Sequence, residues 1–304
     1  MFKSIQLLWK FSRPHTIIGS VISIITLWLL ALKHEINVSH IDVLVSTLLA
    51  GVTCNIFIVG LNQIIDIDLD KINKPNLPLA DGSLTISDAH GIIWTSLVIS
   101  LCSAFYAGPV LGILIIVISL IGIAYSVPPV QLKKHHLPAA LSITVVRGVL
   151  VNVGMFLHFS YASGQIGWQE IQNLPLQIFT NELWILTGFV ITFSIAIAWF
   201  KDLPDTLGDS RFQFKTLALA YSPKVALFGG VFLVFIAYVF AIYRSFIAGN
   251  NLLLYCHIIA VILFIANVVL VNLNKPASVT RFYMYFWVFF FAEYIFFAAW
   301  ALLH

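Results

Sequence analysis

The sequence predicts an all-α polytopic membrane protein, a bundle of about nine transmembrane helices around a central cavity, from two observations. The 304 residues are 60% hydrophobic and only 10% charged, whereas soluble proteins are about 25% charged. Apolar runs of about 20 residues recur along the chain, and each is long enough to cross a bilayer as a helix. Because no soluble domain or low-complexity segment interrupts these runs, we expect one domain over residues 1–304.

The apolar runs define nine expected spans. The second ends at an acidic stretch, and a turn at Gly108 and Pro109 separates the third from the fourth. Pro128 and Pro129 stop the helix after the fourth span, because proline lacks a backbone N–H and restricts the residue before it. The expected spans lie at about 16–32, 41–61, 90–107, 109–126, 137–158, 183–200, 224–243, 252–272 and 281–303.

The basic residues predict the orientation of these spans. If the spans alternate in direction, only Lys33 and Arg244 fall on one side of the membrane, and Arg147 lies within the fifth span. The other basic residues share the side of the N-terminus, which the positive-inside rule places in the cytoplasm: Lys3, Lys10, Arg13, Lys71, Lys74, Lys133, Lys134, Lys201, Arg211, Lys215, Lys224, Lys275 and Arg281. The first residues lack the pattern of a signal or transit peptide, which favours a bacterial chain or a mature form whose leader has been removed.

Acidic residues are concentrated in two short stretches. Six of the thirteen carboxylates follow the second and sixth spans, both on the expected cytoplasmic side. In the first stretch, Asn62, Asp66, Asp70 and Lys74 are spaced by four, so on a helix they share one face, and Asp68 points away from it.

The second stretch repeats this arrangement. Asp202, Asp205 and Asp209 are spaced by three and four, again one helical face, although Pro204 can kink or start the helix there. Carboxylates this close repel one another, and a divalent cation removes the repulsion. Because Mg²⁺ prefers a few carboxylates together with phosphate oxygens, the two clusters are expected to hold magnesium and a diphosphate.

Other interpretations compete with this one. The acids can be solvated loop charges, or belong to a purely structural membrane subunit or to a cation- or proton-coupled transporter. Transporter acids, however, tend to lie near the middle of the bilayer. Here the acids lie at span ends with lysines beside them, which favours a site for phosphate and metal.

The two acidic motifs resemble those of UbiA-type intramembrane prenyltransferases. The first is residues 62–70 with Lys74 and residues 77–82, and the second is residues 201–209. Within that family the chain is most similar to the homogentisate phytyltransferase branch of cyanobacteria and plastids, through residues 11–16, 60–63, 73–78, 125–129 and 200–205. Many other members carry Arg-Pro where this chain has Leu77-Pro78, and the homogentisate branch resembles this chain there. The difference therefore narrows the range of aromatic substrates that the resemblance implies.

The resemblance implies a reaction and a set of site residues. Magnesium held by five aspartates would bind a prenyl diphosphate, phytyl or geranylgeranyl, and stabilise charge as the allylic C–O bond breaks. The allylic cation would attack homogentisate with loss of CO₂, giving a tocopherol precursor. The implied residues are Asp66, Asp70, Asp202, Asp205 and Asp209 for metal, and Asn62, Lys74, Lys133, Lys201 and Tyr125 for substrates. Arg147 and Arg13 are further substrate-binding candidates from their positions, and for Arg13 anchoring at the membrane interface is the alternative.

Several points stay open at this stage. The acceptor can also be a chlorophyllide, a naphthoate or a hydroxybenzoate, and the donor a solanesyl diphosphate. Arg147 lies in a span, where a charge is costly, so we expect it to face the site or to join a structural ion pair. The aromatic residues 282–291 are expected to pack or face lipid rather than to stabilise a cation. Membrane lipid is an expected partner, and nucleic acid is not.

Overall fold

The computed structural model describes residues 2–32, 38–173 and 176–303, and this part of the chain is almost entirely helical. Within it, the one trace of sheet is an isolated bridge between His135 and Lys215. Nine helices in these ranges are long and apolar enough to cross a membrane, which confirms the predicted all-α membrane fold. They are α2 (Pro14–Leu32), α3 (Val38–Ile65), α5 (Ile86–Ala107), α6 (Pro109–Ser126), the run of α7 (His136–Thr144), η2 (Val145–Gly154) and α8 (Met155–Ala162), α10 (Asn181–Phe200), α13 (Pro223–Ile247), α14 (Asn251–Val269) and α15 (Pro276–Leu303).

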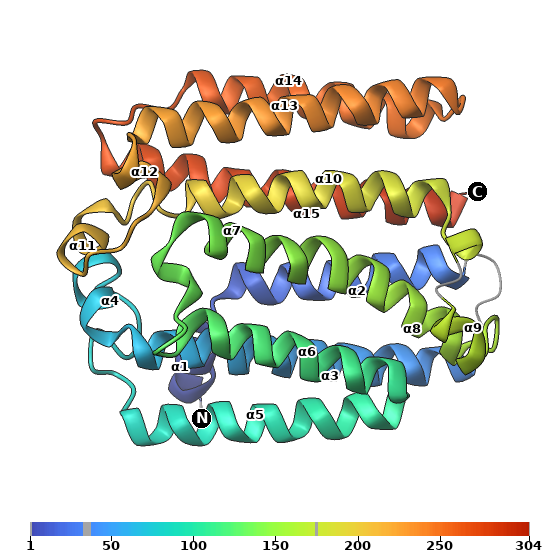
Figure 1. Cartoon of the computed structure of the whole chain (residues 1–304), viewed down its shortest axis with the longest axis horizontal. Coiled ribbons are helices and arrows are strands. Elements are labelled where there is room, and N and C mark those ends of the chain that lie inside the picture. The colour runs from blue at the N-terminus through green and yellow to red at the C-terminus, as the bar shows by residue number, and fades with distance from the viewer. Residues whose placement is uncertain (1, 33–37, 174–175, 304) are drawn as a thin grey trace.

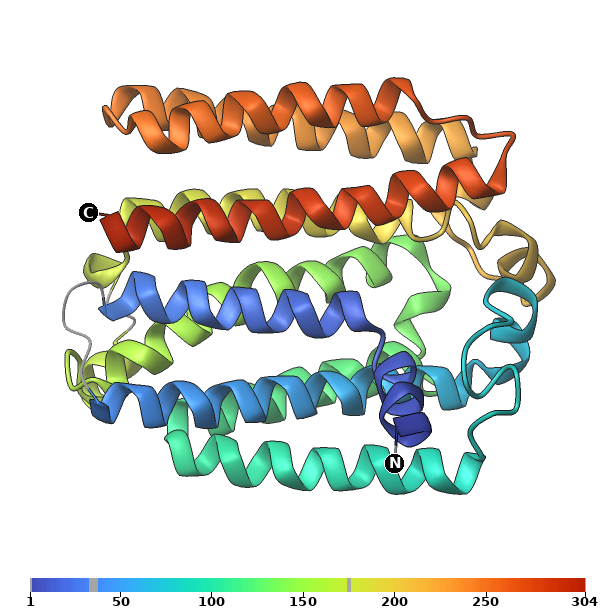
Figure 2. The same cartoon turned by 180° about the vertical axis from the view of Figure 1, so that it is seen from behind.

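Short helices gather at the two ends of the bundle. The spans run side by side along the long axis of the molecule, and α4 (Ile67–Asn73), α11 (Thr206–Arg211) and α12 (Leu217–Ala220) lie together at one end (Figure 1). The short η1 (Leu132–Lys134) precedes α7, while α9 (Trp168–Gln172) and η3 (Leu176–Ile178) lie at the opposite end. The N-terminal helix α1 (Phe2–Phe11) crosses the direction of the spans, as the reverse view shows (Figure 2).

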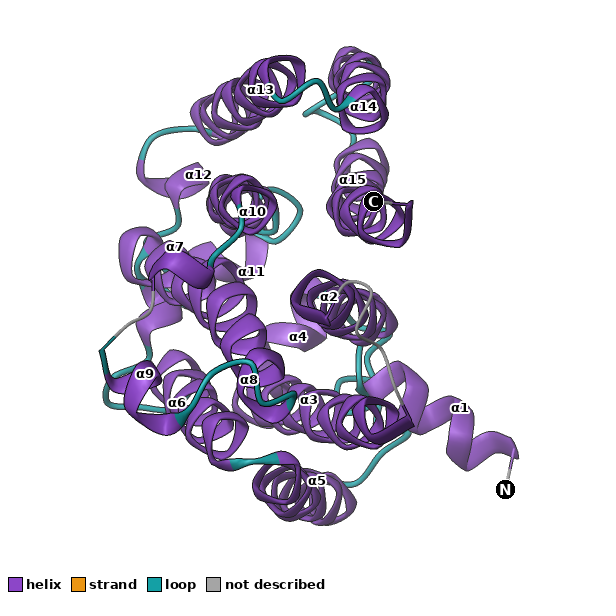
Figure 3. Ribbon diagram, turned by 90° about the vertical axis from the view of Figure 1, so that its right-hand side faces the viewer, coloured by secondary structure: helices purple, strands orange, loops and turns teal. Residues whose placement is uncertain are grey.

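The spans form an inner ring with outer helices packed against it. Seen along the bundle, α2, α3, α6, the α7–α8 run, α10 and α15 surround the centre (Figure 3). The outer helix α5 packs on α3, and the α13–α14 hairpin packs on α10 and α15. Outward-facing side chains such as Val98, Phe232 and Ile262 are about 60% exposed. A soluble surface rarely exposes so much apolar area, and here it faces lipid.

The fifth span is irregular at its centre. Residues Val145–Gly154 form a widened π-type stretch between α7 and α8. π-type stretches are rare in proteins, and many of those that occur lie at functional sites, because the extra residue per turn redirects side chains. The stretch carries Arg147 to the inside of the ring, and its buried Asn152 accepts a hydrogen bond from Tyr294 of α15. The hydrophobic run alone gave no sign of this break.

The basic side chains are unevenly distributed between the two ends. They accompany α4, η1, α11 and the N-terminal ends of α13 and α15, whereas Arg244 lies in the last turn of α13 at the other end. Lys33 lies outside the described residues, and the side chain of Lys3 is not described. The expected charge asymmetry is therefore present among the described side chains.

Candidate active site

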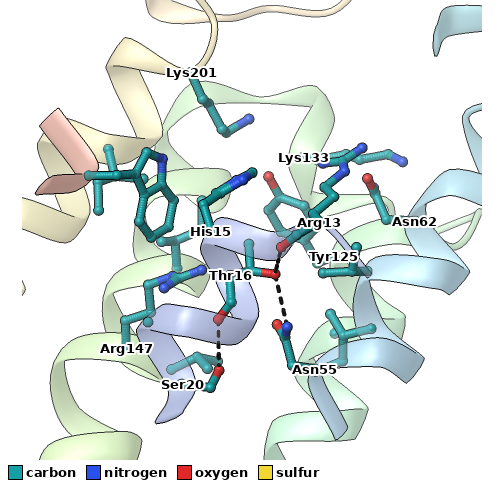
Figure 4. Close-up of a pocket in the computed structure, with 18 of the residues that line it drawn as sticks. Arg13, His15, Thr16, Ser20, Asn55, Asn62, Tyr125, Lys133, Arg147 and Lys201 are labelled. Atoms are coloured by element: carbon teal, nitrogen blue, oxygen red, sulfur yellow. Dashed lines mark hydrogen bonds between the residues drawn. The ribbon is translucent and has the colours of Figure 1, made fainter. Parts of the chain in front are cut away.

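The inner ring encloses a cavity of about 770 Å³ that reaches from the α4–α11 end toward the middle of the bundle. At its inner part, Ile24, Gly51, Ile115 and Met155 give it apolar walls. Figure 4 shows polar side chains from several helices pointing into it. All the residues predicted to form the site line this one cavity: Arg13, Asn62, Asp66, Asp70, Lys74, Tyr125, Lys133, Arg147, Lys201, Asp202, Asp205 and Asp209.

The first acidic cluster lies where α3 passes into α4. Asp66 interrupts the helix, with φ −102° and ψ 15°, so the predicted continuous helical face is wrong in detail. The spacing of four survives because backbone hydrogen bonds still join Asp66 to Asn62, Asp70 to Asp66 and Lys74 to Asp70. Asn62 also donates from Nδ2 to Asp66 Oδ2 at 3.0 Å. Asp68 points to solvent, as its position predicted, and there it pairs with Lys71.

The second acidic cluster is a turn rather than one helical face, which corrects the prediction. Asp202 follows the end of α10, Asp205 precedes α11, and only Asp209 lies inside that helix. Pro204 explains the break, because it has no N–H to continue the helical hydrogen bonds. Asp202 and Asp209 are nevertheless both buried and line the cavity.

Each of the five aspartates that line the cavity already has a partner side chain. Lys133 Nζ lies 2.6 Å from Asp66 Oδ1, and Lys201 Nζ lies 2.8 Å from Asp202 Oδ1. A guanidinium nitrogen of Arg13 lies 3.7 Å from Asp70. The other two partners are Lys74 with Asp205, and Asn73 with Asp209.

The two clusters meet through the last two pairs. Lys74 from the end of α4 forms an ion pair with Asp205 at the start of α11. Asn73 donates to Asp209 Oδ1 at 3.2 Å, and its own Oδ1 accepts the N–H of Gly208 at 2.9 Å. The predicted convergence of two distant stretches at one end of the bundle is therefore present. Asn73 itself had no predicted role, although it stands between Asp70 and Lys74.

Burial changes the acidity of several of these groups. Burial first, and then the neighbouring Asp202 and Asp205, raise the pKa of Asp209 to about 7. Burial likewise raises the pKa of Asp70 and of Asp202. Burial lowers the pKa of Lys133, although the carboxylate of Asp66 opposes this shift. Perturbed acids in a cavity are typical of a functional site.

The aspartate oxygens of the cavity suit a hard divalent cation whose coordination shell is completed by a bound ligand. In the described ranges no three His, Cys, Asp or Glu side chains are already gathered as a closed cage for one ion. Asp70 Oδ2, however, is buried without a hydrogen-bond partner, and further aspartates surround the same space. Mg²⁺ usually takes one or two carboxylates and completes its shell with phosphate oxygens and water, so these residues fit it.

A second polar region lies deeper in the cavity, around Arg147. Its guanidinium carbon is 4.9 Å from the ring centroid of Trp287 and 5.9 Å from that of Phe290. No described carboxylate lies within ion-pair distance of Arg147, so it faces the cavity instead of joining a structural ion pair. A cationic side chain left without a carboxylate in an apolar wall is suited to hold an anionic ligand.

One face of α15 supplies the aromatic wall of the cavity. Tyr283, Trp287, Phe290 and Tyr294 line it at helical spacing. Phe282 and Phe286 pack in the buried core, and Trp287 and Phe290 belong to the same core, so this stretch packs as expected while one face of it lines the cavity. Glu293, on another face of α15 and outside the cavity, is hydrogen-bonded to buried His257, with 2.9 Å between its Oε1 and the imidazole Nε2.

Two solved structures superpose on nearly the whole chain. A UbiA homologue from Aeropyrum pernix K1, solved in its apo form, matches with a TM-score of 0.71 and 17% identity over 93% of this chain and 97% of its own. A UbiA homologue from Archaeoglobus fulgidus bound to GPP and Mg²⁺ matches with a TM-score of 0.63 and 13% identity over 96% and 99%. The bundle therefore has the UbiA fold, an integral membrane architecture.

Two relatives match at higher identity. Homogentisate phytyltransferase of Synechocystis sp. is 37% identical over 96% of this chain and 94% of its own length. Homogentisate solanesyltransferase of Arabidopsis thaliana is 35% identical over 95% of this chain and 75% of its own length. The UbiA prenyltransferase family profile matches residues 21–291. The chain belongs to the UbiA prenyltransferase family.

Proposed function

We propose that this protein transfers a prenyl group, phytyl or geranylgeranyl, from its diphosphate to homogentisate with loss of CO₂, and that the reaction depends on Mg²⁺. The observation that carries the proposal is the meeting of two acidic clusters, linked by Lys74 with Asp205 and Asn73 with Asp209, at one end of an apolar cavity. The product is a methyl-prenyl-benzoquinol of tocopherol biosynthesis. The whole chain, residues 1–304, acts as one prenyltransferase domain.

The acidic end of the cavity binds the diphosphate of the donor. Asp66, Asp70, Asp202, Asp205 and Asp209 hold magnesium, and Asn62 orients Asp66 through its hydrogen bond. When bound, the metal ions neutralise the diphosphate and stabilise the charge that develops on it as the allylic C–O bond breaks. Lys74, Lys133 and Lys201 exchange their carboxylate partners for phosphate oxygens, which adds fixed positive charge where negative charge develops. Arg13 and Tyr125 complete the polar wall.

The middle of the cavity binds the two organic groups. The prenyl chain lies along the apolar wall near Ile24, Ile115 and Met155, where the cost of water contact is avoided. The carboxylate of homogentisate pairs with Arg147, which holds the aromatic ring between the aromatic wall of α15 and the allylic carbon. Trp287 and Phe290 also present π faces to the developing cation.

Arg147 therefore determines acceptor binding. We expect Arg147→Gln to raise the KM for homogentisate by about 100-fold, because an ion pair in a water-poor site contributes a few kcal/mol. The KM for the prenyl diphosphate should stay close to that of the unmodified protein. Steady-state kinetics with each substrate varied in turn measure both values. Equal KM values for homogentisate in the two proteins would place Arg147 outside the acceptor site.

One assay tests the proposed function as a whole. Membranes that contain the protein are incubated with Mg²⁺, homogentisate and a panel of radiolabelled prenyl diphosphates, from geranylgeranyl and phytyl to solanesyl. We expect magnesium-dependent formation of a prenylated quinol with release of CO₂. Transfer to a chlorophyllide, naphthoate or hydroxybenzoate in place of homogentisate would reassign the acceptor. An absence of transfer to any acceptor would favour an ion-coupled transporter.

We also propose where the protein lies in the cell. The end of the bundle with the acidic clusters carries most of the described basic side chains. We therefore place that end and the N-terminus in the cytoplasm. Given the cyanobacterial relative, the membrane is the plasma or thylakoid membrane of a bacterium.

A further inference from the structure

His15 occupies a distinct position in the cavity. It is the one imidazole among the described residues that line it. Its ring meets Trp287 edge-on, with centroids 4.9 Å apart and planes at 61°. The guanidinium carbon of Arg147 lies 4.9 Å from the centroid of the same indole. His15 and Arg147 thus contact one aromatic ring, and Figure 4 shows both in the same cavity.

The backbone before α2 fixes this position. Arg13 has a left-handed backbone with φ 51°, and Pro14 then begins α2. The hydroxyl of Thr16 donates to the Arg13 carbonyl at 2.8 Å, and Asn55 donates to that hydroxyl at 2.9 Å. This turn sends Arg13 toward Asp70 and His15 toward Trp287. His15 therefore lies only two residues after Arg13, which belongs to the diphosphate end of the cavity. Its ring nevertheless contacts the aromatic wall beside Arg147.

The proposed reaction needs a group beside the aromatic ring of homogentisate that can accept a proton and return it. A bond forms between the allylic carbon and a ring carbon of homogentisate, and diphosphate leaves with the electron pair of the broken C–O bond. The ring carbon then loses its proton, and the C–H electron pair restores aromaticity. The side chain loses CO₂, the electron pair stays on the benzylic carbon, and that carbon takes up a proton. One proton leaves and one is gained, so no net proton is released.

We propose that His15 carries this proton: it accepts it from the ring carbon and returns it to the benzylic carbon. This inference rests on the proposed function. A neutral imidazole can accept a proton on a ring nitrogen, and the cation so formed can donate that proton again. The five carboxylates have cationic or amide partners at the diphosphate end, and the lysines and arginines are already cationic. The hydroxyl of Tyr294 is engaged in donating to Asn152 at 2.8 Å.

Two substitutions test the role of His15 in the full-length protein, with magnesium, homogentisate and the prenyl diphosphate that the panel identifies. We expect His15→Gln, which keeps polarity without acid–base capacity, to lower kcat about 100-fold. Its KM for the prenyl diphosphate should not change, because His15 does not bind the diphosphate. His15→Ala should lose as much activity, and added imidazole should restore part of it. His90→Gln, on the exposed face of α5, is the matched control and should retain full activity.

The outcomes separate this inference from the proposed function. Failure of the unmodified protein to prenylate homogentisate would remove the function itself. If that protein is active, an unchanged kcat in His15→Gln would overturn the role of His15. A loss in His15→Ala that imidazole does not restore would also overturn proton transfer and would make His15 a positioning residue. Imidazole rescue is a readout that a purely structural role does not produce.

Discussion

Asp66 and Asp68 lie two residues apart but in opposite environments. The side chain of Asp66 is 11% exposed and contacts both Asn62 and Lys133. The side chain of Asp68 is 76% exposed and pairs with Lys71 at the surface. A buried carboxylate costs free energy unless it is compensated. The burial of Asp66 at the mouth of a cavity is therefore a stronger sign of function than its charge alone.

This contrast gives a matched pair of substitutions. Asp66→Asn should lower the rate of magnesium-dependent prenyl transfer at least about 100-fold, because the metal that holds the diphosphate loses an anionic ligand. Asp68→Asn, with the same change of charge two residues away, should leave the rate unchanged. Radiolabelled transfer measures both rates, and circular dichroism confirms that both variants fold. Full activity in Asp66→Asn would remove the metal assignment for the first cluster.

Asp209 provides a prediction on pH. Burial, and then the neighbouring Asp202 and Asp205, raise its pKa to about 7 from the usual 3.8 of an aspartate. Between about pH 4 and pH 7, Asp209 is therefore protonated in the folded protein and ionised in the unfolded chain, so the stability that this site contributes falls as pH rises through that window. Without magnesium, the melting temperature should fall over this range in the unmodified protein and fall less in Asp209→Asn. Identical pH profiles for the two proteins would contradict the raised pKa.

At the scale of elements, α4 and α11 are joined by Asn73. Its side chain bonds both the carboxylate of Asp209 and the backbone N–H of Gly208, which no shorter side chain could do. The packing there is also tight, since a Cβ on Gly208 would overlap the Asn73 side chain. The Asn73 amide, together with the ion pair between Lys74 and Asp205, therefore holds the two acidic clusters at their separation.

Removal of this amide should loosen the diphosphate site. Asn73→Ala is expected to raise the KM for the prenyl diphosphate about tenfold, which corresponds to the 1.4 kcal/mol or so that such hydrogen bonds contribute. The KM for homogentisate should change little, because Arg147 lies deeper in the cavity. Gln172→Ala, on an exposed face of α9 at the other end, serves as the control. A rise in both KM values by the same factor would indicate general distortion instead.

The spans were predictable from the sequence and the helix breaks were not. Hydropathy located all nine spans to within about five residues, because burial in lipid requires long apolar runs. The break at Asp66, the turn around Pro204 and the widened stretch around Arg147 depend on packing between helices, which hydropathy does not contain. The aspartates were visible because charge is rare in this chain. Asn73 was not, since nothing local distinguishes it from an ordinary turn residue.

At the scale of the whole molecule, the charge asymmetry predicts an orientation. In a variant without native cysteines, Ser83→Cys, in the exposed loop before α5, should react only with thiol reagents that enter the cytoplasm. Gln172→Cys at the opposite end should react with an impermeant reagent applied outside. Labelling of intact cells with the two reagents measures both positions. The reverse pattern would invert the proposed topology.

The pairing of each cavity aspartate has a thermodynamic consequence. Five carboxylates face four cationic side chains and one amide, so the resting mouth of the cavity has almost no net charge. A free cation arriving alone meets the lysines, and a free diphosphate arriving alone meets the aspartates. Each therefore gains little binding free energy until the other is present. Metal and donor should enter cooperatively, each increasing the affinity of the other by the same factor, so that the mouth stays inert toward stray ions and toward metal-free phosphates.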